Sequence, residues 1–64
     1  MNNNAIIFSE YPDVVSPEDV QHMLHMGRNS VYKLLKEEKI KSIKVGKKYI
    51  IPKKSVIRFI DINT

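Results

Sequence analysis

The hydrophobic residues of this chain follow a helical period up to about residue 39. They recur every three or four positions in two groups, Val20, Met23 and Leu24, then Val31, Leu34 and Leu35. This spacing predicts two amphipathic helices, Pro17–Leu24 and Arg28–Glu38, joined by a three-residue turn at His25–Gly27. In that turn we expect Met26 to point inward and Gly27 to cap the second helix. Two short helices with a tight turn between them form a helix-turn-helix.

The first helix has a well-marked start. Ser16 suits the N-cap, Pro17 suits the first helical position, and Asp19 stands where a capping box places its acid. Val14–Val15 precedes this start as a short extended entry. Upstream, residues 1–13 are predicted to form a partly disordered N-terminal arm, whose apolar run Ala5–Phe8 is either a strand or a segment that lies on the core.

After Lys39 the helical period gives way to β-branched and aromatic residues. Ile40–Val45 and Lys48–Ile51 are predicted strands of a β-hairpin, with Gly46-Lys47 as a two-residue turn that has Gly first. Pro52 cannot donate to a strand ladder and ends the hairpin. Lys53–Ile62 is a predicted third helix, and its apolar stripe is Val56, Phe59 and Ile60, widened by Ile57.

One face of the hairpin must pack on the helices. We expect Ile43 and Val45 to face the core together, because they lie two positions apart. On the second strand Tyr49 and Ile51 are the preferred inward residues, and the opposite register is the alternative. The predicted fold class is α+β and mostly helical: a winged helix-turn-helix domain over residues 14–62, with the hairpin as the wing.

Charge is distributed very unevenly along the chain. The net charge is +4, yet all eleven basic residues lie between Arg28 and Arg58, with two acids among them. The first 27 residues carry four acids and no Lys or Arg. This separation favours a nucleic acid as the partner. An acidic protein or membrane surface is the alternative, while charge that serves solubility alone would be interspersed.

Several classes of protein find no support in the sequence. The 64 residues suffice for one small domain, and without cysteine there is no disulfide or thiolate-metal site. The only histidines are His22 and His25, and with no Cys and no convergent acid beside them we expect no metal. No Ser/His/Asp set can be argued, so we expect no enzyme activity, and we expect no cofactor. Gly46-Lys47-Lys48 lacks the second Gly and the Ser or Thr of a phosphate-binding loop. With no secretory signal and no membrane span, we expect a soluble, cytoplasmic protein.

The polar face of the second helix is the candidate DNA-reading surface. Its residues are Arg28, Asn29, Ser30, Tyr32, Lys33 and Lys36. Asn29 can hydrogen-bond adenine, and Arg28 or Lys33 can hydrogen-bond guanine, in the major groove. The alternative for each is an ordinary solvated helix face.

Three of these residues have other expected roles. Lys36 is expected to contact a phosphate. Ser30 either hydrogen-bonds a phosphate or supports the helix start. The Tyr32 hydroxyl either reaches a phosphate while its ring packs on the hairpin, or the residue serves packing alone.

The hairpin and the third helix contribute further candidates. Lys44, Lys47 and Lys48 are expected to contact the DNA backbone or the minor groove, although lysines at a hairpin also prevent aggregation through the strand edge. Lys53 and Lys54 lie at a helix start, where the helix dipole disfavours cations. We expect phosphate to compensate there.

Short motifs in a fixed order span Val14–Asp61. They are Val15-Ser16, Glu18-Asp19-Val20, Met23-Leu24, Ser30-Val31-Tyr32-Lys33-Leu34-Leu35, Ile43-Lys44-Val45-Gly46-Lys47-Lys48 and Ile51-Pro52-Lys53-Lys54-Ser55-Val56. The set resembles the small excisionase-type helix-turn-helix proteins, which are related to the DNA-binding half of MerR-type regulators. Gln21 and His25 depart from the family pattern, which has a small residue and a glycine there. We therefore expect a looser helix crossing, with Gln21 turned outward and His25 left-handed.

The resemblance implies double-stranded DNA binding at the attachment site of a mobile element, where such proteins bend DNA and steer an integrase toward excision. A small transcriptional regulator, such as a repressor, is the alternative, and a protein-interaction module on the same fold is a third hypothesis. The predicted third helix ends near Ile62 without a long dimerisation helix. We therefore expect a monomer in solution that binds adjacent, directly repeated sites cooperatively.

Overall fold

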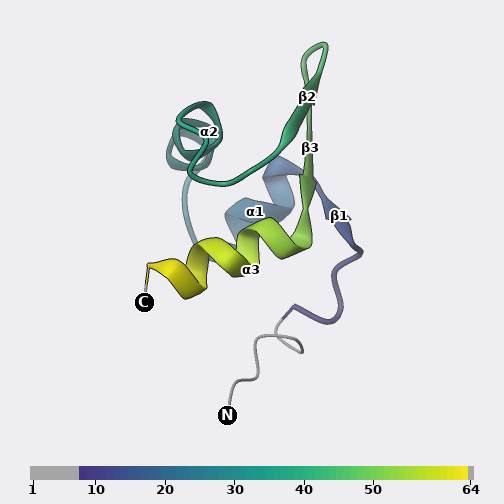
Figure 1. Ribbon diagram of the computed structural model, residues 1–64, viewed down its shortest axis with the longest axis vertical. Helices are drawn as coiled ribbons and strands as arrows, with labels where there is room; N and C mark the ends of the chain where they lie inside the picture. Colours follow the sequence, from purple (N-terminus) through teal and green to yellow (C-terminus); the bar gives the residue numbers. More distant parts are fainter. Residues whose placement is uncertain (1–7, 64) are drawn as a thin grey trace.

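A computed structural model describes residues 8–63 of the chain. Its elements, in order, are β1 (Val14–Val15), α1 (Pro17–Leu24), α2 (Arg28–Lys36), β2 (Ile43–Val45), β3 (Lys48–Pro52) and α3 (Lys53–Ile62) (Figure 1). The predicted bounds of the first and third helices are confirmed, and the second helix is two residues shorter than predicted. The predicted disorder of residues 1–4 and most of the apolar run at 5–8 lie outside the described residues.

The start and the end of α1 are fixed by hydrogen bonds at its caps. The predicted capping box is present, since the N–H of Asp19 donates to Ser16 Oγ and the N–H of Ser16 donates to Asp19 Oδ2, each at 3.1 Å. At the other end His25 is left-handed, with φ 55° and ψ 44°. The N–H of Met26 then donates to the carbonyl of Gln21 at 3.0 Å, which closes the helix end.

The second helix ends in the same way as the first. Gly27 is its N-cap, as predicted. Glu38 is left-handed, with φ 59°, and the N–H of Lys39 donates to the carbonyl of Leu34 at 2.9 Å. Both α1 and α2 are therefore followed by a non-glycine residue with a positive φ, which ends the helix. Gln21 is half-buried in a hollow between α1 and α2, so it is not turned fully outward as expected.

The three strands form one antiparallel sheet in the order β1-β3-β2. The two-residue turn between β2 and β3 is confirmed, with Val45 opposite Lys48 and Gly46 at φ 62°. Helix-turn-helix, hairpin and C-terminal helix make an α+β winged helix-turn-helix, as predicted. As predicted, β3 ends at Pro52, which is its last residue and also the N-cap of α3.

The predicted inward orientation of Ile43 and Val45 is wrong. These side chains are 61% and 59% exposed. Because the turn has two residues, Lys44 pairs with Tyr49, and Ile43 and Val45 fall on the opposite face from Tyr49. An inward Tyr49 and Ile51 therefore excludes an inward Ile43 and Val45. The prediction for β3 holds, since Ile51 is fully buried and Tyr49 is half-buried.

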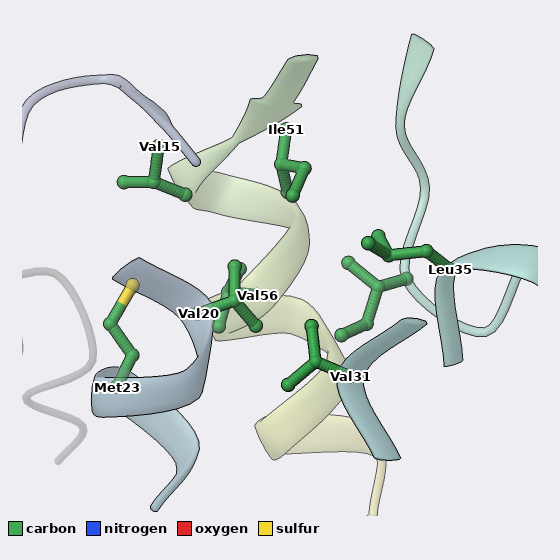
Figure 2. Packing of buried hydrophobic residues seen from close by; sticks show 8 residues of the cluster. Val15, Val20, Met23, Val31, Leu35, Ile51 and Val56 are labelled. Atoms are coloured by element: carbon green, nitrogen blue, oxygen red, sulfur yellow. The ribbon is translucent and has the colours of Figure 1, made fainter. Parts of the chain in front are cut away.

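The hydrophobic core is small and draws on nearly every element. Its buried residues are Val15, Val20, Met23, Val31, Leu35, Ile40, Ile51 and Val56. Their side chains converge from β1, α1, α2, β3 and α3 (Figure 2). Ile40 reaches the core from the linker between α2 and β2, not from a strand as predicted. Met26 was predicted to point inward but is 37% exposed.

The segment from Phe8 to Asp13 is fastened to the domain. The rings of Phe8 and Tyr11 lie edge to face, 5.9 Å apart, and both residues pack against the core. The N–H of Lys53 donates to the carbonyl of Asp13 at 2.7 Å. This part of the predicted N-terminal arm is therefore packed structure. Among residues 8–63, no helix is long and apolar enough to cross a membrane.

The backbone at His25 predicts opposite effects for two substitutions. His25→Gly should stabilise the domain by about 0.5–1 kcal/mol, because glycine adopts a positive φ without steric cost. His25→Val should destabilise it by about 1–2 kcal/mol, because a β-branched side chain opposes that φ. Urea unfolding followed by circular dichroism measures both. Equal stabilities for the two variants would contradict this account of the turn.

Candidate nucleic-acid interface

One side of α2 is exposed and basic, and the other is buried. Val31 is fully buried and Leu35 is 3% exposed. On the opposite side all the following are exposed: Arg28, Asn29, Ser30, Lys33 and Lys36. This division matches the predicted helical wheel. It follows from the 3.6-residue period, which turns Asn29, Lys33 and Lys36 away from Val31 and Leu35.

α2 and the wing lie at the same end of the molecule. In Figure 1, α2 and the hairpin of β2 and β3 stand side by side, with α1 and α3 below them. The linker at residues 37–42 runs between them. The four acids of the first 27 residues lie on α1 and on the segment that precedes β1. The separation in space is partial, because Glu18 lines one hollow with Arg28 and Asp19 lines another with Lys48.

Two tyrosines connect α2 to the wing. The rings of Tyr32, from α2, and Tyr49, from β3, are 5.8 Å apart in an edge-to-face arrangement with an angle of 67°. The guanidinium of Arg28 lies 5.6 Å from the centre of the Tyr32 ring, and the ammonium of Lys44 lies 5.3 Å from that of Tyr49. The ring contact between Tyr32 and Tyr49 crosses from α2 to the wing and has a preferred geometry, so it helps to orient the wing relative to α2. Each cation–π contact lies within one of the two elements. We call these four residues the tyrosine bridge.

The wing presents lysines in three directions. Gly46-Lys47 forms the tip, and the lysines at 44, 47 and 48 are all exposed. Lys44 pairs with Tyr49 and so faces α2, while Lys48 pairs with Val45 on the opposite face of the hairpin. The two-residue turn causes this arrangement, because it sets which residues share a face. A ribbon with cations on both faces and at its tip suits a surface with phosphates on either side.

Lys53 is used differently from what we expected. Its ammonium donates to the carbonyl of Tyr11 at 2.9 Å and contacts that of Phe8 at 3.4 Å. These carbonyls, not a phosphate, compensate for a cation at the start of α3. We therefore remove Lys53 from the candidate interface. The helix-start pattern around Lys53 could not indicate this role, because the two carbonyls lie more than 40 positions away in the sequence. Lys54 is exposed at the same helix start and remains a candidate.

Sequence reasoning also missed a groove between α2 and the wing. The groove has a volume of about 470 Å³ and is lined by Leu35, Lys36, Glu38, Lys41, Ser42, Lys44 and Tyr49. Lys41 and Ser42 were predicted to lie in a strand. Neighbouring residues of a strand point to opposite faces, so the prediction gave no reason to place both in one groove. They belong instead to the linker, whose path depends on the burial of Ile40.

Comparison with known proteins decides the family. A family model described as a helix-turn-helix domain matches residues 14–62. The chain belongs to this helix-turn-helix family. The family includes excisionase-type small DNA-binding proteins, which agrees with the resemblance carried by the sequence motifs. Searches of the curated proteins and of the solved structures gave no significant match. Membership of a helix-turn-helix family indicates sequence-specific DNA binding.

The tyrosine bridge predicts energetic coupling between α2 and the wing. In a double-mutant cycle, Tyr32→Leu and Tyr49→Leu should couple by about 0.5–1.5 kcal/mol in the free energy of unfolding. Tyr11→Leu provides the control, because its ring contacts Phe8. Paired with Tyr49→Leu it should give additive losses. Additive losses for Tyr32 and Tyr49 as well would show that the rings do not hold the two elements together.

Proposed function

We propose that this helix-turn-helix protein is an excisionase-like architectural factor that binds double-stranded DNA and promotes the excision of a mobile element. The observation that carries the proposal is the joint presentation of α2 and the wing at one end of the molecule, joined by the tyrosine bridge. Two cationic elements held in a fixed relation suit two neighbouring grooves of one duplex. The match to a helix-turn-helix family that includes excisionase-type proteins supports the DNA-binding part of this proposal.

In this proposal α2 enters the major groove. Asn29 reads adenine, and Arg28 and Lys33 read guanine, from the first turns of the helix. Lys36 contacts a phosphate near the helix end. Ser30 hydrogen-bonds a phosphate, and Tyr32 supports α2 through its ring. The exposure of the polar residues on this side of α2 supports these roles.

The wing contacts the backbone and the adjacent minor groove. Lys47 reaches out from the tip, and Lys44 and Lys48 reach from the two faces of the hairpin, so phosphates on either side are within range of a lysine. Lys54 adds a phosphate contact from the start of α3. Glu18 and Asp19 share hollows with Arg28 and Lys48, so these two acids lie near the proposed interface and weaken its attraction for DNA.

A small transcriptional regulator of a phage or mobile element would use the same interface. The two functions differ in where the DNA site lies, at a recombination attachment site or at a promoter. An excision function adds a protein partner, an integrase or recombinase, inside the cell. Footprinting across the flanking DNA of the gene distinguishes them. Protection confined to a promoter would favour the regulator and contradict the excision role.

Substitutions of exposed basic residues test the interface directly. Lys33→Ala and Lys47→Ala should each weaken DNA binding roughly tenfold and reduce its dependence on salt, because each removes a cation facing the duplex. Arg58→Ala is the matched control, since it removes an exposed charge from α3, outside the proposed interface. For the unsubstituted protein, the slope of log affinity against log salt should be about −4 to −6. Equal losses in all three variants would contradict the interface.

The arrangement of DNA sites tests the proposed mode of assembly. A monomer that lacks a two-fold axis should bind directly repeated sites cooperatively, and gel shifts on direct and inverted repeats of one half-site measure this. The direct repeat should yield the doubly bound complex at lower protein concentration. A preference for the inverted repeat would show that the protein dimerises about a two-fold axis.

A further inference from the structure

The groove between α2 and the wing brings together residues from three segments, namely α2, the linker and the hairpin. One wall is α2, with Leu35 and Lys36, and the other is the hairpin, with Lys44 and Tyr49. The linker supplies the remaining lining residues, Glu38, Lys41 and Ser42. In Figure 1 this linker passes between the helix and the hairpin, so it joins the two elements proposed to contact DNA.

The lining of the groove suits a phosphate backbone. Three lysines, Lys36, Lys41 and Lys44, line it together with one acidic residue, Glu38. Ser42 adds a hydroxyl that can donate to a phosphate oxygen. The half-buried Tyr49 adds apolar area, against which a deoxyribose can pack. A groove with cations, a hydroxyl donor and apolar area has the features needed for sugar and phosphate together.

The geometry of duplex DNA places a backbone strand at this position. Adjacent major and minor grooves are separated by one sugar-phosphate strand. If α2 lies in the major groove and the wing reaches the next minor groove, the surface between them must face that strand. The groove lies between these two elements. Its position and its chemistry therefore point to the same ligand.

We propose that one DNA strand passes along this groove, with Lys41 and Ser42 as phosphate contacts that supplement α2 and the wing. This inference rests on the proposed function, because it assumes that α2 and the wing engage one duplex. Glu38 opposes the strand electrostatically and so lowers the affinity. Its carboxylate keeps backbone binding weaker, which favours sites where α2 makes correct base contacts.

Neighbouring residues of equal charge provide matched controls. Lys39 and Glu37 are exposed, as Lys41 and Glu38 are, but they do not line the groove. The experiment compares Lys41→Gln with Lys39→Gln, and Glu38→Gln with Glu37→Gln. Each pair makes the same change in net charge within two positions of sequence. The probe is an arbitrary duplex of about two helical turns, roughly 21 base pairs, because phosphate contacts do not depend on sequence.

Binding is measured by fluorescence anisotropy over a range of salt concentrations. Lys41→Gln should weaken binding roughly 3- to 10-fold at about 0.1 M salt and reduce the salt slope by about 0.9, the value for one lost phosphate contact. Lys39→Gln should change both by less than half as much. Glu38→Gln should strengthen binding roughly 2- to 5-fold, and Glu37→Gln should leave it nearly unchanged. Thermal unfolding of each variant shows whether a loss of binding reflects a loss of folded protein.

The outcomes separate this inference from the proposed function. Equal effects within both pairs, in folded variants, would mean that only net charge matters, and the groove proposal would be wrong. Lys33→Ala would still weaken binding in that case, and the α2 interface would stand. A Lys33→Ala variant that binds as tightly as the original protein would instead overturn the proposed function. Differences within both pairs support the passage of a strand through the groove.

Discussion

The edge-to-face contact between Tyr32 and Tyr49 is the interaction on which the DNA-binding arrangement depends. α2 and the wing are separate elements, and this contact joins them on the exposed side of the core. The guanidinium of Arg28 lies against the Tyr32 ring, and the ammonium of Lys44 lies against the Tyr49 ring. Two cations proposed to contact DNA therefore also pack on the two tyrosines. Because duplex grooves have fixed spacing, two elements that enter them gain more affinity when their own spacing is fixed in advance.

The hydrophobic core beneath the bridge is small, so each helix or strand that packs on it is anchored by only one or two buried side chains. Among residues 8–63, eight are buried in the core, and β1, β3 and α3 contribute one each. A fully buried valine or isoleucine contributes about 1.5–3 kcal/mol, a large share of the stability of so small a domain. Ile40 anchors the linker, because its side chain is buried in the core while the next two residues, Lys41 and Ser42, line the groove. The core thus positions charged residues that it does not itself contain.

Much of this fold could be predicted from local patterns. Helical spacing located Pro17–Leu24 and Lys53–Ile62, and cap chemistry at Ser16 and Asp19 fixed the first helix start. Side-chain orientation in the hairpin could not be predicted correctly from alternation alone. Alternation identifies two faces, but the length of the turn decides how the faces of β2 and β3 are matched, and this put Ile43 and Val45 outside.

The candidate site could be predicted only where it depends on local sequence patterns. The basic face of α2 follows from helical period, and the lysines of the wing follow from composition. The hydrogen bond from the Lys53 ammonium to the Tyr11 carbonyl and the groove at Lys41 depend on contacts between distant segments. Such contacts produce no periodic pattern in the sequence. The side-chain roles that sequence reasoning missed are therefore those set by tertiary packing.

An NMR titration with duplex DNA tests the central claim most directly, namely that α2 and the wing engage DNA as one unit. Backbone amide resonances of α2, at residues 28–36, and of the wing, at residues 44–48, should shift together and yield the same dissociation constant. Resonances of α3 beyond its first turn should shift little. Shifts confined to α2, or a wing that titrates with a separate and weaker constant, would contradict the account.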